Sequence, residues 1–446
     1  MNKNRQTLKY IVSDFLTAIL AWLLFNLLRY SEIAKYDFST LSNYLLYYQV
    51  LKGQILMPFF WFFIYFLSGY YNKPFGKSRI GELFTTLISV TTGTVMIFFI
   101  VVLDDLPKSF HIYYNLFFAL CGLQFLLTYT GRIWITSHAL RKIRNHEWSK
   151  NVIIIGKGKN AEKTKKELQN TEYKIIECLD ENENIANIIE NRQIDEIIVS
   201  SDSENIAQLL YHLYRYRCPI KIAPKRNNLL SKIKVKDIHS VPFVDITENN
   251  FSEAGKNIKF LMDKTVAVLI LLLLSPLYVY IALKVKADSK GAVFFRQERI
   301  GYRGKPFTIV KFRTMYADSE KQGPLLTERD DKRVTPFGRF LRKYRLDEIP
   351  QFWNVLKGDM SLVGPRPEQR YYIDRIVEKA PYYYLLHNVR PGITSLGMVK
   401  YGYADTVDKM IERLDYDILY YKNMSLLLDI TILLHTVKTV FTGKGV

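Results

Sequence analysis

Cysteine is scarce in this 446-residue chain: it has only Cys121, Cys178 and Cys218, an odd number spread far apart. So small a set excludes a disulfide-stapled scaffold. The sequence also has no His/Cys cluster with zinc spacing, no GxxxxGKS/T phosphate loop and no GxSxG hydrolase motif. Disorder is excluded as well, because 48% of the residues are hydrophobic and can form a core.

Negative charge is in short supply: 43 acidic residues face 62 Lys and Arg, which leaves a net charge of +19. The excess is concentrated in residues 284–345, which alone carry a net charge of +10. By charge alone, the partner of this segment is a nucleic acid, an anionic membrane surface or a phosphorylated substrate.

Four long apolar stretches occupy residues 1–140, at about 8–28, 49–70, 82–103 and 112–137. Each is long enough to cross a hydrocarbon core of roughly 30 Å as a helix. They predict four transmembrane helices in a lipid bilayer. The basic residues before the first stretch and after the fourth place both flanks in the cytoplasm.

After residue 140 the pattern changes to short apolar runs that alternate with helical patterns. The strand candidates are 151–155, 173–179, 194–200 and 220–223. Such alternation predicts a small Rossmann-like α/β domain over 141–225. Residues 226–258 are interpreted as a basic linker with one short strand near 241–245.

The turn Gly156-Lys157-Gly158 follows the first of these strands and precedes a helix, with Ala161 at the third small position. One interpretation is a dinucleotide fingerprint that binds a regulatory nucleotide. The other is a tight turn that packs the helix on the strand. We favour the turn, because no catalytic His or Tyr-Lys pair accompanies it.

The apolar segment 265–283 is interrupted by Ser275-Pro276. Proline lacks the amide hydrogen that a helix needs there, so a kink is expected. Basic residues flank both ends, which a single spanning helix does not satisfy but a helix that enters and returns does. We therefore predict a re-entrant helix over 263–286. The amphipathic segment 415–441 fits the membrane surface and the domain core equally well.

Two adjacent acidic residues, Asp347 and Glu348, stand before an apolar stretch that ends at Gly358. Asp347 is expected to cap a helix there and to stay ionised at its N-terminus. Taken alone, this pattern indicates only helix capping. The pair nevertheless has basic residues on both sides of it in the sequence: Lys311 and Arg342 before it and Arg366 after it. Arg366 lies between two prolines, which restrict its backbone. Lys and Arg around paired carboxylates suit phosphoryl chemistry, with cations for the phosphates and acids for a metal or for attack.

These residues carry a resemblance to the monotopic phosphoglycosyl transferases, also called bacterial sugar transferases. The similarity covers 260–446. Its motifs are FRQERIG at 295–301, KFRTM at 311–315, RVTPFG at 333–338, LDEIPQ at 346–351, NVLKGDMS at 354–361, GPRP at 364–367 and RPGIT at 390–394.

The resemblance implies the long form of that family: a four-helix transmembrane bundle at 1–140, the Rossmann-like domain, and a mainly α catalytic domain at 259–446 whose re-entrant helix breaks at Ser275 and Pro276. Such enzymes transfer a sugar-1-phosphate from a UDP-sugar to polyprenyl (undecaprenyl) phosphate, release UMP, and begin the assembly of exopolysaccharide, capsule or glycoconjugate. The expected location is the bacterial inner membrane with the catalytic domain on its cytoplasmic face, as a homodimer and with no nucleic acid partner.

By position, the resemblance makes Asp347 the nucleophile that forms a phosphosugar intermediate and Glu348 a ligand of Mg²⁺. Lys311, Arg342 and Arg366 correspond to basic active-site positions that bind substrate phosphate. Two departures are visible: Arg345 stands where many members have Ser, and residues 395–398 (SLGM) replace Gly-Leu-Trp-Gln. The second departure leaves the donor sugar open.

Two other hypotheses remain at this point. A membrane-anchored dinucleotide sensor or scaffold for polysaccharide assembly would use the acidic pair only to cap a helix. A membrane-tethered nucleotide-sugar oxidoreductase or epimerase would need a Tyr-x-x-x-Lys beside the fingerprint, and this is missing.

Overall fold

The computed structural model comprises two compact units, one of residues 1–149, 168–174 and 252–258, the other of residues 150–167, 175–251 and 259–446. The structure describes residues 3–75, 77–102, 110–145, 147–156, 159–168, 171–180, 185, 188–189, 192–200, 206–223, 235–238, 241–316 and 331–442.

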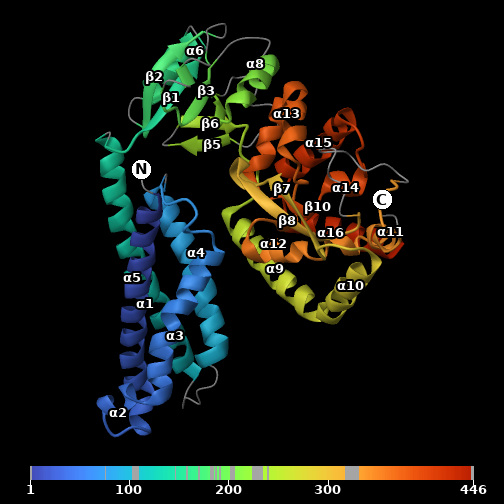
Figure 1. Ribbon diagram of the computed structural model, residues 1–446. Helices are drawn as coiled ribbons and strands as arrows, with labels where there is room; N and C mark the ends of the chain where they lie inside the picture. The colour runs from blue at the N-terminus through green and yellow to red at the C-terminus, as the bar shows by residue number, and fades with distance from the viewer. Residues whose placement is uncertain are drawn as a thin grey trace. The chain divides into compact units, whose positions relative to one another are not determined.

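The first unit is a bundle of four long apolar helices, as the sequence predicts: α1 (Lys3–Glu32), α3 (Tyr48–Leu67), α4 (Arg79–Ile97) and α5 (Phe110–Arg144). They run alongside one another, with the short helix α2 (Leu41–Leu45) at one end (Figure 1). Each is long and apolar enough to cross a membrane. Their outward faces carry exposed Leu, Ile and Phe side chains, as lipid contact requires.

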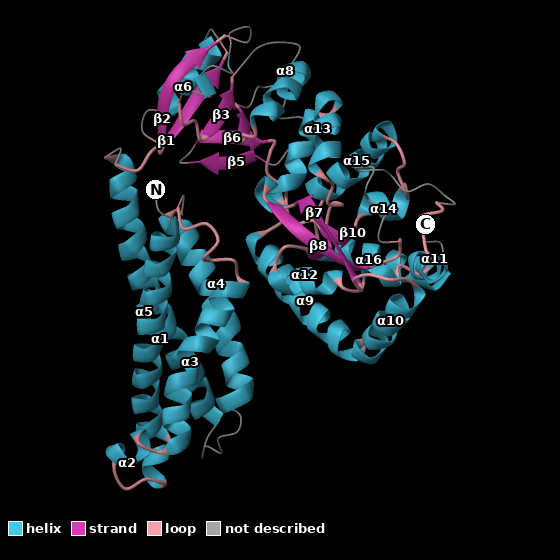
Figure 2. Ribbon diagram, viewed as in Figure 1, coloured by secondary structure: helices cyan, strands magenta, loops and turns pink. Residues whose placement is uncertain are grey.

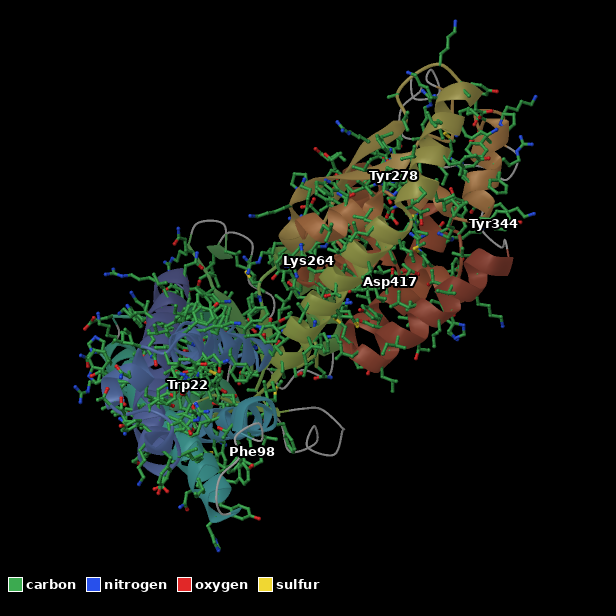
Figure 3. The ribbon with its side chains drawn as sticks, turned by 90° about the horizontal axis from the view of Figure 1, so that it is seen from below. Trp22, Phe98, Lys264, Tyr278, Tyr344 and Asp417 are labelled. Atoms are coloured by element: carbon green, nitrogen blue, oxygen red, sulfur yellow. The ribbon has the colours of Figure 1, made fainter. Side chains whose placement is uncertain are left out.

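The interior of the bundle combines aromatic packing with buried charge. Trp22, labelled in Figure 3, and Trp61 are both at most 4% exposed. Over the rings of Tyr65 and Tyr70, the guanidinium of Arg132 donates to both carboxylate oxygens of Asp14, at 2.9 and 2.8 Å, and to Thr86. Arg132 has no solvent exposure, so this ion pair is enclosed by the helices.

The second unit begins with an α/β layer whose strands are β1 (Lys150–Ile155), β2 (Tyr173–Leu179), β3 (Glu196–Val199), β4 (Ile220–Ile222), β5 (Val235–Ile238) and β6 (Val241–Asp245). The sheet order is β2-β1-β3-β4-β6-β5. The β1–β3 and β3–β4 pairs are parallel, while β6 runs antiparallel to β4 and β5. Figure 2 shows helices α6 (Lys159–Leu168) and α8 (Ile206–Leu213) beside these strands.

This α/β layer confirms the predicted parallel sheet. The segment interpreted as a linker contains the hairpin of β5 and β6. This hairpin extends the sheet, because Ile222 of β4 pairs with Val244 of β6. Two residues of the predicted fingerprint turn, 157 and 158, lie outside the described residues. Gly156 is described: its backbone has φ 131° and its N–H donates to Leu179 O at 2.8 Å.

Helices α9 (Glu253–Leu273) and α10 (Ser275–Asp288) meet at an angle of 64°. Lys264 and Tyr278 mark the two arms in Figure 3. The break falls where the sequence predicts it: Pro276 lies in the first turn of α10, and the Ser275 hydroxyl donates to Leu272 O at 2.8 Å. Leu272 and Leu273 at the bend are 69% and 79% exposed. By length and composition the pair is either a broken span or a re-entrant element.

The remaining elements pack into one layered domain around a core that includes Val355, Met360, Ile373, Leu414 and Tyr420. A hairpin of β7 (Phe294–Ile300) and β8 (Pro306–Phe312) is followed by α11 (Pro336–Lys343), the 3₁₀ turn η6 (Leu346–Glu348) and α12 (Gln351–Lys357). Then come β9 (Ser361–Val363), α13 (Arg370–Lys379), η7 (Pro381–Asn388), β10 (Gly392–Thr394), α14 (Leu396–Lys400), α15 (Val407–Lys422) and α16 (Leu426–Thr442).

Candidate active site

Asp347 and Glu348 lie in the 3₁₀ turn η6, between α11 and α12. The expectation that Asp347 caps a helix is wrong: α12 begins only at Gln351, and the acidic pair precedes it in a separate turn. Arg345 turns the chain into η6 with a left-handed backbone, φ 53°. The predicted helix end is confirmed, because Gly358 adopts φ 93° and its N–H donates to Asn354 O and Val355 O.

Both oxygens of the Glu348 carboxylate have cationic partners. Lys311 Nζ donates to Oε1 at 2.7 Å, and Arg345 Nη1 lies 3.5 Å from Oε2. Lys311 is held by its strand, because the Asn354 side chain on α12 accepts from Val310 N at 3.2 Å and donates to Thr308 O at 2.7 Å. The hairpin and the helix therefore fix the cation and the acid against each other.

The two acids differ in pKa because their electrostatic surroundings differ. Burial raises the pKa of Asp347, and the negative charge of Glu348 raises it further, to about 6. Burial also acts to raise the pKa of Glu348, but Lys311 and Arg345 outweigh it and lower that pKa. Asp347 is therefore less acidic than expected for a residue at a helix N-terminus, while Glu348 is firmly anionic.

Arg342 lies on α11, within reach of the charge of Asp347. Its Nε donates to Thr314 Oγ1 at 2.9 Å, which orients the guanidinium from the segment after β8. The start of α11 is fixed on the same segment: Thr335 N donates to Thr314 O at 3.0 Å, and the Thr335 hydroxyl caps the helix. Burial lowers the pKa of Arg342, although arginine at any ordinary pH remains a cation.

Arg366 reaches the pair from the segment after β9. The charges of Glu348 and Glu368 outweigh burial and raise its pKa. Its Nη1 donates to Met398 Sδ at 3.3 Å, and its Nε lies 3.9 Å from Glu368 Oε1. All five residues predicted from the sequence, Asp347, Glu348, Lys311, Arg342 and Arg366, thus converge on one site.

Two further residues belong to this site by geometry. Arg345 pairs with Glu348, and the sequence signal for it was its departure from the family pattern. Met398 contacts Arg366 and lies within the second departure.

Few side chains at this site could bind a divalent metal ion. Within the described ranges no group of three or more His, Cys, Asp and Glu side chains is placed to hold a metal ion. Mg²⁺ does not need such a cage, because it is commonly held by one or two carboxylates together with substrate phosphates and water. The Asp347 and Glu348 carboxylates fit that requirement.

Comparison with known proteins places the catalytic elements in a family. The family model described as bacterial sugar transferase matches residues 254–443. An undecaprenyl-phosphate galactose phosphotransferase of Salmonella typhimurium is 30% identical over 433 residues, which cover 86% of this chain and 85% of that protein. The chain belongs to the bacterial sugar transferase family.

Other family members match over shorter lengths. A UDP-N-acetylgalactosamine-undecaprenyl-phosphate N-acetylgalactosaminephosphotransferase of Aeromonas hydrophila is 45% identical over 184 residues, 41% of this chain and 44% of that protein. The uncharacterized sugar transferase EpsL of Bacillus subtilis is 40% identical over 189 residues, 42% of this chain and 90% of its own length. The chain thus spans about half the length of the Aeromonas relative and nearly all of the Bacillus one.

Proposed function

We propose that this protein transfers a sugar-1-phosphate from a UDP-sugar to undecaprenyl phosphate, releases UMP, and so begins the assembly of a polysaccharide or glycoconjugate. The observation that carries the proposal is the buried pair Asp347 and Glu348, with Lys311 and Arg345 on the Glu348 carboxylate and two further arginines beside it. Paired acids among fixed cations suit the transfer of a phosphoryl group between anionic partners. Relatives named for this transfer support the substrate classes.

The reaction proceeds in two displacements at the phosphorus that carries the sugar. A carboxylate oxygen of Asp347 attacks this phosphorus and forms an acyl-phosphate bond. The bond from phosphorus to the bridging oxygen breaks, and its electron pair leaves with UMP. A phosphate oxygen of undecaprenyl phosphate then attacks the same phosphorus and releases the Asp347 carboxylate, which gives undecaprenyl diphospho-sugar.

The surrounding residues assist both displacements without a proton transfer. The attacking carboxylate is ionised above its pKa of about 6, and the acceptor phosphate is already anionic. Arg342 and Arg366 bind phosphate oxygens and offset the charge that develops on the leaving UMP. Lys311 holds Glu348 in place through its 2.7 Å hydrogen bond.

Mg²⁺ is the proposed cofactor, with Glu348 as its protein ligand. When bound, the ion supplies Lewis-acid stabilisation of the phosphate oxygens. The carboxylate suits it because its pKa is lowered, so the metal does not have to displace a proton. Its two oxygens are shared with Lys311 and Arg345, of which Arg345 makes the longer contact and is the partner we expect to yield.

The membrane arrangement is part of the proposal. The four helices of the bundle span the inner membrane, while α9 and α10 enter the cytoplasmic leaflet and return, so that the catalytic domain faces the cytoplasm. The 64° bend, the exposed leucines at it and the basic flanks support this arrangement. A membrane-embedded acceptor then reaches the acidic pair from the same leaflet. Assembly as a homodimer is the proposed oligomeric state.

The direct test is a panel of UDP-sugars in membranes that contain the protein and undecaprenyl phosphate. The names of the relatives include N-acetylgalactosamine and galactose, so UDP forms of both, with UDP-glucose, make up the panel. We expect UMP release and a lipid-linked phosphosugar with at least one donor, and loss of both with Asp347→Asn. A sensor or scaffold would release no UMP in either case.

A further inference from the structure

Glu368 is a buried acidic residue that lies among arginines, two positions after Arg366 in the chain. From α15, Arg413 Nη2 donates to Glu368 Oε1 at 2.6 Å. From β7, Arg299 Nη1 lies 3.5 Å from Glu368 Oε2 and also donates to Pro367 O at 3.2 Å. Both oxygens of this carboxylate are therefore engaged by cations that come from other parts of the catalytic domain.

Arg366 is close to the same carboxylate but is not bound by it. Its Nε lies 3.9 Å from Glu368 Oε1, the oxygen that Arg413 occupies, and this is beyond hydrogen-bonding distance. A small movement of either side chain would bring Arg366 and Glu368 into a direct ion pair. Burial lowers the pKa of Arg366, but the charges of Glu348 and Glu368 outweigh it and raise that pKa. Arg366 is thus attracted by the acidic pair of the site and by Glu368.

The contact between Arg413 and Glu368 decides which of these attractions acts on Arg366 without competition. A buried carboxylate that loses its cation is costly, because an unpaired charge is left out of water. If Arg413 did not occupy Oε1, Arg366 would be the cation placed to replace it. Its guanidinium would then turn toward Glu368, and its donors would be lost to a phosphate oxygen.

Arg413 is held in place by the packing of α15. The side chains of Arg413 and Glu368 are each 6% exposed. Arg413 Cγ lies against Gly397, where a Cβ atom would approach it to 2.7 Å. One turn later on the same helix, Asp417, labelled in Figure 3, accepts from Gly397 N at 2.9 Å. One face of α15 therefore holds both the backbone at Gly397 and the carboxylate of Glu368.

We propose that Arg413 is a positioning residue for phosphate binding: by occupying Glu368, it keeps the guanidinium of Arg366 free for a substrate phosphate. This inference rests on the proposed function, in which Arg366 binds phosphate oxygens. Hydrogen bonds from a guanidinium to a carboxylate and to a phosphate are both charge-assisted. Glu368 is therefore a strong competitor for Arg366 when Arg413 is absent, and a weak one when Arg413 holds it.

The competition predicts non-additive effects of two substitutions. Arg413→Met keeps an aliphatic side chain against Gly397 but removes the cation, which frees Glu368 to bind Arg366. We expect KM for the UDP-sugar to rise roughly tenfold, with kcat within about twofold of wild type because saturating substrate displaces Glu368. Glu368→Gln removes the competing charge and should leave KM within about twofold of wild type. In the double variant the competing charge is also absent, so KM should match Glu368→Gln within about twofold.

Further variants grade the contact and control for charge. Arg413→Lys keeps a cation for what is a single hydrogen bond, and KM should stay within about threefold of wild type. Arg413→Gln keeps a donor without the charge and should lie between Lys and Met, which preserves the test if Arg413→Met does not fold. Lys409→Met removes an exposed cation of the same helix, paired with Asp405, and should leave KM unchanged.

Binding of UDP to the purified full-length protein is measured by calorimetry for each variant. Because this measurement needs no turnover, it separates failure of this inference from failure of the proposed transferase. A rise of KM or of the UDP dissociation constant in Arg413→Met that disappears in the double variant supports the inference.

Three results overturn it. Equal values in wild type, Arg413→Gln and Arg413→Met show that Arg413 does not keep Arg366 free. A rise that persists in the double variant, or that Glu368→Gln shows alone, means that Glu368 is not the competitor. A fall in kcat with unchanged KM, even one that the double variant restores, assigns the pair a purely structural role.

Discussion

Lys311 Nζ donates to Glu348 Oε1 at 2.7 Å, although the two residues are 37 positions apart, on β8 and in η6. This hydrogen bond ties the hairpin to the acidic turn and gives Glu348 its lowered pKa together with Arg345. It is the contact through which the β-hairpin takes part in the proposed chemistry.

Loss of this cation should impair transfer severely. Lys311→Met keeps the length of the side chain but leaves Glu348 with Arg345 as its nearest cation. We expect kcat/KM for the UDP-sugar to fall by roughly 10²–10³-fold, the size of loss that follows removal of one preorganised charged or hydrogen-bonding group from a catalytic site. Lys305→Met, an exposed lysine at the turn of the same hairpin, is the matched control and should retain full activity. Equal rates in the two variants would remove Lys311 from the site.

The pH dependence of transfer should follow the ionisation of Asp347. Its pKa is raised to about 6 from 3.8, so the attacking carboxylate is present above pH 6 and is lost as the pH falls through that value. We expect kcat/KM to decrease roughly tenfold per pH unit below about pH 6. The measurement is the pH–rate profile for UMP release between pH 4.5 and about 8. A profile that stays flat down to pH 4.5 would show that no group with a raised pKa limits the reaction.

The break between α9 and α10 should depend on Pro276. In Pro276→Ala the ring is removed and a backbone donor is restored, so the apolar helix can run straight through the bend. A straight helix of this length is able to span the bilayer. We expect part of the protein to adopt a spanning topology and activity to fall. New cysteines near Lys256 and Lys290, labelled from each side of the membrane, report the topology.

Two labelling results would contradict this account of the bend. If the wild type is labelled from opposite faces at the two positions, the helix pair crosses the membrane. If Pro276→Ala matches the wild type in labelling and activity, the packing of α10 against Phe312 and Leu341 holds the bend without proline.

The buried ion pair of the bundle should be essential to its stability. Arg132→Leu leaves the carboxylate of Asp14 without its cation in a fully buried position. Breaking such a pair from one side costs roughly 3–5 kcal/mol. We expect a clearly lowered temperature of aggregation in detergent for Arg132→Leu, and little change for Arg141→Leu, an exposed arginine on the same helix. A similar aggregation temperature for both variants would show that the pair does not stabilise the bundle.

Much of the fold follows from local patterns that the sequence displays directly. Four apolar stretches of spanning length became four helices, and the alternation after residue 140 became a parallel sheet, because both depend on periodicity within one segment. The break at Ser275-Pro276 was predictable for the same reason, since proline acts on its own turn of helix.

The sequence predicted which residues form the site better than it predicted how they are arranged. The family motifs identified the acids and three cations, but the local pattern at Asp347 suggested a helix cap where the chain instead forms a separate 3₁₀ turn after a left-handed Arg345. The separate turn depends on the tertiary packing of α12 against β8, where Asn354 bonds to the strand backbone. The raised pKa of Asp347 has the same origin, because burial and the proximity of Glu348 arise only in the folded chain.

Asp417 could not be found from the sequence. It lies on α15, and its Oδ1 accepts from Gly397 N, 20 positions away, at 2.9 Å. It belongs to no motif with a fixed spacing. Its contact depends on how α14 and α15 pack, which no periodicity specifies.

The covalent intermediate is the central claim, and trapping tests it most directly. The protein is incubated with a UDP-sugar labelled in the sugar-bearing phosphate, without undecaprenyl phosphate, then denatured and digested. The account predicts label on the peptide that contains Asp347, release of an equal amount of UMP, and neither in Asp347→Asn. Absence of labelled peptide, with transfer that requires donor and acceptor bound together, would contradict it and assign the attack to undecaprenyl phosphate itself.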